Sequence, residues 1–329
     1  MRETGRRHAR MNERRVARAL VLAALLAGAA AGTMPARAEE PSPLRTGDAE
    51  RGARVYARTC AACHGRSGRG DGPGASDLDP LPRSFTEGQF RFRTTPSGRL
   101  PRPEDIERTV RRGLPGTAMP AFGEVLSARE IADLTAYVIP LAPEAMEPGS
   151  PVEAVAIPAV PEPSAASIAE VRSLYRIMEC WSCHGLDGSG HGQSAEGLVN
   201  EVGDPILPTD FRYAPLKGGR EPEAVVRTLL TGLNGTPMPA YGDAMLLARE
   251  DVENLSAYEG RLPKAAIDEM GAFIRGIPSG ADIAAMDEAG KIALRDRRLA
   301  ALAHYVLSLR RRGLGPWLFR ERPEKEARR

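Results

Sequence analysis

Apolar residues recur at helical spacing in three segments of the first half of the chain, 48–60, 104–112 and 127–141. The first segment places Val55 and Tyr56 on one face. Loops rich in glycine and proline separate the segments, and no stretch of useful length alternates between apolar and polar residues as a half-buried strand would. The pattern therefore predicts an all-α fold.

The ends of these helices are marked in the sequence. Pro103 precedes the second segment, and proline is favoured in the first turn of a helix. Ser127 and Glu130 form a capping-box pattern at the start of the third. The apolar face of that helix consists of Ile131, Leu134, Val138 and Leu141.

Two Cys-x-x-Cys-His motifs, at 60–64 and 180–184, contain every cysteine of the chain. The spacing is typical of c-type haem attachment, in which two thiols form thioethers with the haem and the adjacent histidine ligates the iron. The predicted haem-attaching cysteines are Cys60, Cys63, Cys180 and Cys183, and the predicted iron ligands are His64 and His184.

Two other roles fit the surroundings of these motifs less well. A thioredoxin-like thiol pair is expected within a βαβ pattern, which the sequence lacks. A zinc site needs four ligands gathered together.

The surroundings of the two motifs repeat with them. The motifs lie 120 residues apart, residues 90–92 match 211–213 at an offset of 121, and residues 116–121 match 235–240 at an offset of 119. A chain of 329 residues accommodates about two domains. We therefore expect two homologous domains.

The second repeat contains extra residues before its last helix. Residues 134–138 match 302–306 at an offset of 168, which places an insertion at about 247–295. Helical patterns at 265–274 and 283–294 lie within it. The expected division is a first domain at 39–141, a Pro- and Ala-rich linker at 142–167, a second domain at 168–310 and a polar tail at 311–329.

A methionine in each repeat is the candidate for the second axial iron ligand. Met119 follows His64 by 55 residues, and Met238 follows His184 by 54, each within a Gly-Thr-x-Met-Pro loop. The proline after each methionine stiffens the loop and disfavours helix there. A lone methionine is usually a core residue, but the repeated context favours iron ligation by its thioether.

The remaining histidines of the later chain have other expected roles. His191 lies in a glycine-rich loop, where solvent exposure is expected. His304 matches Ala136 on the closing helix, which favours packing or surface exposure, and it is the first rival to Met238 as a ligand.

Arginines follow a phenylalanine in both repeats, at Arg91 and Arg212. Arginine binds carboxylates bidentately, so both are candidates for contacts with haem propionates. Docking of an acidic partner and a solvated loop are the alternatives.

The N-terminus resembles a secretory signal. An arginine-rich segment precedes the apolar run 19–31, and Ala36-Arg37-Ala38 fits a cleavage site, so we expect cleavage after about Ala38. A membrane anchor is the alternative, but the run is too short to span well.

Cleavage changes the charge of the protein. Residues 1–38 hold eight Arg and two Glu, so the mature chain keeps 37 basic and 41 acidic residues, a net charge of −4. This charge gives no indication of nucleic-acid binding, and no later stretch approaches the length of a transmembrane anchor.

At these motifs the chain resembles class I c-type cytochromes, specifically periplasmic dihaem proteins made of two fused domains. The resemblance covers about residues 45–141, 168–246 and 295–310. It implies two tandem all-α, class I cytochrome c-like domains around two covalently attached c-type haems with their iron.

The expected function is electron transfer in the periplasm between a redox protein donor and acceptor of a respiratory chain, with no catalytic residues. One alternative is a dihaem enzyme, such as a cytochrome c peroxidase or a thiosulfate dehydrogenase, which needs an exchangeable iron ligand. Another is a haem subunit of a larger respiratory complex in the membrane, with the insertion as its docking surface.

Overall fold

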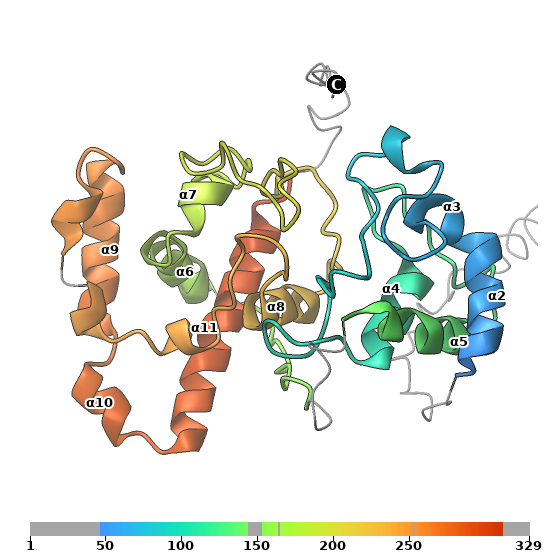
Figure 1. Cartoon of the computed structure of the whole chain (residues 1–329). Coiled ribbons are helices and arrows are strands. Elements are labelled where there is room, and N and C mark those ends of the chain that lie inside the picture. The colour runs from blue at the N-terminus through green and yellow to red at the C-terminus, as the bar shows by residue number, and fades with distance from the viewer. Residues whose placement is uncertain (1–46, 144–152, 164, 253, 312–329) are drawn as a thin grey trace, which may run out of the picture. The chain divides into compact units, whose positions relative to one another are not determined.

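The computed structural model describes residues 47–143, 153–163, 165–252 and 254–311. Within these ranges the structure is helical, and its β-structure is limited to one isolated bridge between Val199 and Pro205 (Figure 1). The predicted all-α fold is confirmed. The expected secretory signal and cleavage site, much of the linker and nearly all of the tail lie outside the described residues.

The first repeat contains the three predicted helices. Their bounds are α2 (Ala49–Thr59), α4 (Pro103–Arg112) and α5 (Ala128–Val138), and the first haem motif forms the short helix α3 (Ala61–His64). The short 3-10 helices η1 (Ala75–Asp77) and η2 (Ile139–Leu141) complete the repeat. The expected capping box is present, because Glu130 N donates to Ser127 Oγ at 3.2 Å and Ser127 N donates to Glu130 Oε2 at 2.9 Å.

Helices α2 and α5 cross at very short distance. A Cβ atom at Gly52 would lie 2.0 Å from the carbonyl oxygen of Asp133, so only glycine allows this approach. The crossing buries one face of each helix, including Val55, Tyr56 and Leu134. It sets the position of the haem motif, which directly follows α2.

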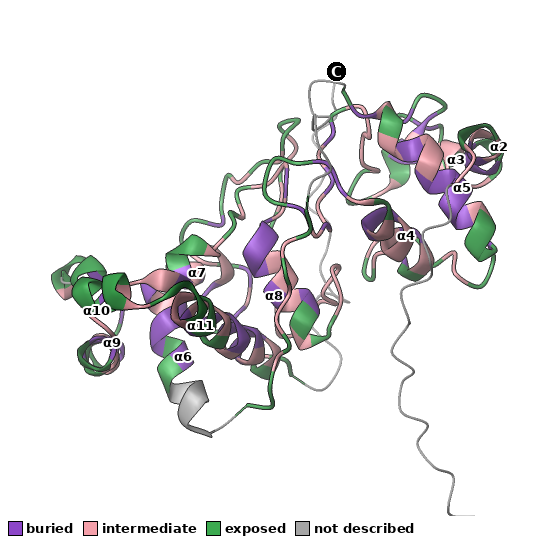
Figure 2. Ribbon diagram, turned by 90° about the horizontal axis from the view of Figure 1, so that it is seen from below, coloured by how far each residue is buried: buried purple, intermediate pink, exposed green. Residues whose placement is uncertain are grey.

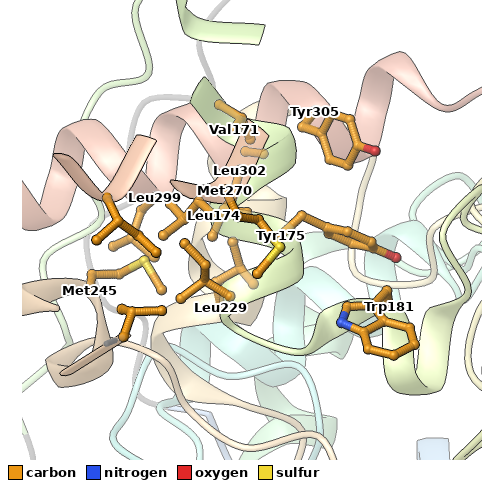
Figure 3. Close-up of a cluster of buried hydrophobic side chains, with 14 of the residues drawn as sticks. Val171, Leu174, Tyr175, Trp181, Leu229, Met245, Met270, Leu299, Leu302 and Tyr305 are labelled. Atoms are coloured by element: carbon orange, nitrogen blue, oxygen red, sulfur yellow. The ribbon is translucent and has the colours of Figure 1, made fainter. Parts of the chain in front are cut away.

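The second repeat has the same arrangement. It contains α6 (Ala165–Ile177), α7 (Cys180–His184), α8 (Pro222–Thr231) and α11 (Glu288–Ser308). The rings of Tyr175 and Tyr305 lie 5.1 Å apart at one end of its buried cluster (Figure 3), as do those of Tyr56 and Tyr137 in the first repeat. This equivalence of Tyr137 and Tyr305 agrees with the 168-residue offset of the closing helices.

The described extra residues of the second repeat form four elements before α11. They are η5 (Arg249–Val252), η6 (Leu255–Tyr258), α9 (Lys264–Gly276) and α10 (Gly280–Ala285), and η4 (Asp243–Leu246) precedes the insertion. Helix α9 packs against α6 and buries Met270 completely (Figures 1 and 3). The insertion therefore extends the core of the second repeat.

The prediction of one helix over 283–294 is wrong. Helix α10 ends at Ala285, Met286 is extended, and Asp287 starts α11 by accepting a hydrogen bond from Gly290 N at 2.8 Å. The aspartate is a strong N-cap, and it begins a helix that continues through residue 295 into the closing segment. The expected boundary between the insertion and the last helix at residue 295 thus falls inside α11.

The described part of the linker is attached to both repeats. Val155 N donates to the Thr94 carbonyl at 2.7 Å, and His304 Nε2 donates to the Pro161 carbonyl at 2.6 Å.

Buried residues follow the inner faces of α5, α8 and α11 (Figure 2). Among the residues described, none of the helices combines the length and apolar character needed to cross a bilayer.

The N-terminus of α2 is joined to α5 by a buried carboxylate. Asp133 accepts hydrogen bonds from Arg51 Nε at 2.7 Å, Arg51 Nη2 at 2.9 Å and Asp48 N at 2.7 Å. These bonds, led by that from the Arg51 guanidinium, lower the pKa of Asp133 below its ordinary value. The ionised carboxylate therefore stabilises the fold of the first repeat.

We expect Asp133→Asn to lower the unfolding free energy by about 1–3 kcal/mol at neutral pH, because three donors lose a charged acceptor. The folded-state pKa is the lower one, so this contribution is present above about pH 4, the ordinary range of the group, and is lost as the pH falls through the folded-state value. Denaturant unfolding between pH 3 and 7 checks this, with the exposed Glu124→Gln as control. A difference that is independent of pH would contradict it.

Candidate functional site

Each haem motif is anchored by a tyrosine from the helix that precedes it. Tyr56 of α2 donates its hydroxyl hydrogen to the Gly65 carbonyl at 2.7 Å, and Tyr175 of α6 donates to the Gly185 carbonyl at 2.8 Å. Both glycines directly follow the motif histidine and have positive φ angles of 76° and 77°. The two repeats thus turn the chain after the motif in the same way.

The ring of His64 is oriented by a loop of the first repeat. Its Nδ1 lies 2.9 Å from the Arg83 carbonyl oxygen, and it stacks on Phe85 with 4.6 Å between ring centroids. A carbonyl only accepts, so Nδ1 carries the hydrogen and Nε2 is left with a lone pair for a metal.

His184 is held in the same way. Its Nδ1 donates to the Thr209 carbonyl at 3.3 Å, and its ring stacks on Phe211 at 4.3 Å. Burial lowers the pKa of both His64 and His184. Both imidazoles are therefore biased toward the neutral form that ligates a metal.

The four cysteines are free and half-buried. Burial raises the pKa of the Cys60 thiol and raises that of Cys180 to about 12. A redox-active thiol pair needs the opposite shift, toward thiolate. Zinc would require further ligands, and the described residues gather no group of three histidine, cysteine or acidic side chains.

The two methionine loops have the same internal hydrogen bonds. In the first, Met119 N donates to Thr117 Oγ1 at 3.1 Å, and Thr117 Oγ1 donates to the Leu114 carbonyl at 2.8 Å. In the second, the equivalent distances, at Met238, Thr236 and Leu233, are 3.2 Å and 2.8 Å.

Each loop is also closed by the carbonyl of its methionine. Leu114 N donates to Met119 O, and Leu233 N donates to Met238 O, both at 3.1 Å. The threonine of each Gly-Thr-x-Met-Pro sequence thus has a structural reason, which is to fix the backbone at the methionine.

Each methionine packs on the same cluster as its haem motif. Met119, Cys60 and Phe85 contact the buried cluster of the first repeat. Met238 contacts that of the second repeat, together with its equivalent cysteine and phenylalanine. Soft sulfur, imidazole and thiol groups around apolar side chains form a donor set that fits a covalently attached haem.

The structure changes the pairing of the two aromatic segments. Phe85 N donates to the Gly68 carbonyl at 2.6 Å, and Phe211 N donates to the Gly188 carbonyl at 2.8 Å. Phe85, rather than Phe90, is therefore the counterpart of Phe211. The expected offset of 121 is wrong here because the conserved contact is the stacking on the motif histidine, which sequence matching does not detect.

The two candidate propionate-binding arginines consequently have different surroundings. The Nε atom of Arg91 is buried without a hydrogen-bond partner, and Arg91 Nη2 lies 3.7 Å from Glu201 Oε2. The guanidinium of Arg212 is occupied by Asp210 at 3.0 Å and Asp187 at 2.5 Å. Of these two arginines, only Arg91 keeps a buried donor that could bind an additional anionic group.

The other histidines lie outside the donor sets. His191 is exposed, as expected for its loop. His304 uses its Nε2 to bind the linker carbonyl of Pro161, as described above. The hydrogen bonds to Arg83 and Thr209 are the functional contacts that sequence analysis missed, because a backbone acceptor leaves no signature in the residue type.

Comparison with known proteins gives one family and one structure. No protein of curated function matches the chain. The sequence matches the family described as cytochrome c oxidase, cbb3-type, subunit III, over residues 47–138 and 166–258. A chain of the reducing HAO-like protein complex of Kuenenia stuttgartiensis is 31% identical, with a TM-score of 0.62, and the match covers 82% of this chain and 100% of that one. The first matched segment covers the first repeat, the second covers the second repeat as far as residue 258, and the chain belongs to this cytochrome c family.

Proposed function

We propose that this protein is a periplasmic dihaem c-type cytochrome that transfers single electrons between respiratory redox partners. The observation that supports it best is the duplication, with the same hydrogen bonds, of a histidine site and a methionine loop. A c-type haem, when bound, supplies an iron that alternates between the ferrous and ferric states and so carries one electron.

The proposed attachment residues are the four cysteines, and the proposed iron ligands are His64 with Met119 and His184 with Met238. The carbonyls of Arg83 and Thr209 orient the imidazoles. The threonine-closed loops hold the thioethers in place. With both axial positions taken by protein side chains, neither iron would offer an open position to a substrate, which favours electron transfer over catalysis.

Arg91 is the proposed contact for a haem propionate, because its buried Nε has no hydrogen-bond partner. We do not extend this role to Arg212, whose guanidinium is already bound by two carboxylates.

The second proposal is that this protein is a haem subunit of a larger respiratory complex, whose other subunits are its redox partners. The family description names an oxidase subunit, and the similar structure belongs to a protein complex. Elements α9 and α10 have no counterpart in the first repeat, so they offer surface specific to such a partner. The proposed secretory signal would place the protein in the periplasm, where c-type haem attachment and these partners are expected.

We expect the mature protein to carry two covalent haems and to begin after about Ala38. Acid-acetone extraction should leave the colour with the protein, and intact-mass measurement should give the cleaved chain plus two haems. Cys183→Ala should leave the first repeat fully loaded. Extractable haem, or a retained N-terminus, would contradict this prediction.

Replacement of Met119 or Met238 should free one coordination position on the iron that the methionine ligates. In Met119→Ala or Met238→Ala, the weak far-red absorption of the ferric Met-ligated iron should fall by about half, because one of two thioether ligands is lost. Met286→Ala, in a half-buried position outside the methionine loops, is the control. If the band kept its full intensity in one variant, that methionine would not be a ligand.

The second haem should have the higher reduction potential. Trp181 is buried within the second motif, whereas its counterpart in the first, Ala61, is small and half-buried. Burial disfavours the extra charge of ferric iron. In a redox titration, Met238→Ala should remove the higher-potential wave and Met119→Ala the lower one. Removal of the lower wave by Met238→Ala, or coincident waves in the wild type, would refute the shielding argument.

A further inference from the structure

The two repeats differ at a buried arginine. Equivalent arginines of α4 and α8 donate to the carbonyls of Phe92, at 3.4 Å, and Gly218, at 2.5 Å. The next residue is Arg93 in the first repeat and Gly219 in the second. Arg93 is completely buried and has no counterpart in the second repeat.

The guanidinium of Arg93 binds the last carbonyls of α8, in the second repeat. Its Nη2 donates to Thr231 O at 2.7 Å and its Nη1 to Gly232 O at 3.5 Å, while Nε donates to Pro96 O at 3.2 Å. Burial lowers the pKa of Arg93 to about 10, so the group stays charged at neutral pH. A buried charge needs these acceptors, so the contact is specific rather than incidental.

The end of α8 has a particular need for this cation. The last turn of α4 contains its own basic residues, Arg111 and Arg112, whereas the last turn of α8 contains none. The C-terminal carbonyls of a helix carry partial negative charge and favour a nearby cation. Arg93 supplies that cation to α8 from the other repeat.

A second contact holds the next residues of the same segment. The buried Asn234 accepts a hydrogen bond at Oδ1 from Gly98 N at 3.0 Å. Its position in the first repeat is taken by Pro115, which has no side-chain acceptor. The 93–98 turn of the first repeat thus binds residues 231–234 at two points.

Residues 231–234 contact the backbone of Met238 directly. A Cβ atom at Gly232 would lie 3.0 Å from Met238 O and 2.8 Å from Ala240 N. The backbone at Gly232 therefore packs directly against the backbone of residues 238–240. Leu233 N donates to Met238 O at 3.1 Å. A shift of the α8 end would therefore displace the methionine.

We propose that Arg93 is a positioning residue of the second iron site, which holds the Met238 loop in place from the first repeat. The proposal rests on the proposed ligation of the second iron by Met238. It makes the first repeat a structural part of the second redox site, whereas no arginine among the described residues donates to the Met119 loop in the same way.

The test is cyanide binding to the ferric holoprotein, because cyanide must displace the methionine. In Arg93→Met, cyanide should bind one of the two irons about tenfold faster than in the wild type, the scale of losing hydrogen bonds to a charged group. The other iron should keep its wild-type rate. Arg93→Lys, which retains the charge, should restore part of the difference.

Controls separate loop positioning from general damage. The exposed Arg69→Met removes the same charge elsewhere in the first repeat and should have no effect. Haem content and far-ultraviolet circular dichroism should be unchanged in all variants. Asn234→Ala should act in the same direction more weakly, and it provides the test if Arg93→Met does not fold.

A double-mutant comparison assigns the affected iron. In a Met238→Ala background, Arg93→Met should cause no further acceleration, because its target ligand is gone. Equal acceleration at both irons, or a full additional effect in that background, would overturn the proposal. If Met238→Ala alone left cyanide binding unchanged, the proposed ligation would fail instead, irrespective of Arg93.

Discussion

The proposed ligation of each iron requires an imidazole and a thioether from segments about 55 residues apart to meet at one point, and both repeats hold these two segments with the same hydrogen bonds. Neither side chain can be left to rotate freely. The imidazole is fixed by a bond from Nδ1–H to a loop carbonyl and by stacking on a phenylalanine. The backbone that carries the thioether is fixed by a threonine of the same loop. The crossing of α2 with α5, and of α6 with α11, holds these parts in register.

Residue types with strong local chemistry made much of this predictable. The haem motifs, the Thr-x-Met-Pro loops and the capping box at Ser127 each indicate their structure directly. Contacts that depend on backbone carbonyls or on tertiary packing were not accessible. The orientation of His64 by the Arg83 carbonyl and the equivalence of Phe85 with Phe211 depend on residues that no local pattern marks. The break at Met286 differs, because Asp287 is an N-cap residue that the helical pattern over 283–294 did not take into account.

The two repeats share one arrangement but differ in what surrounds it. The core of the second repeat is enlarged by η5, η6 and α9, its motif contains the buried Trp181, and the end of α8 accepts a hydrogen bond from Arg93 of the first repeat. The first repeat keeps the simpler arrangement, with its own basic residues at the end of α4. Under the proposed function, the two equivalent sites have different surroundings, which is a physical route to two different reduction potentials.

Carbon monoxide binding to the fully reduced wild-type protein tests whether both irons are closed by protein ligands. Carbon monoxide binds ferrous haem rapidly wherever an axial position is open. With both irons closed, carbon monoxide should bind slowly and to far less than one equivalent per haem, and hydrogen peroxide should not be turned over. Rapid binding of one equivalent at either haem, or peroxide turnover, would contradict this closure and indicate a dihaem enzyme.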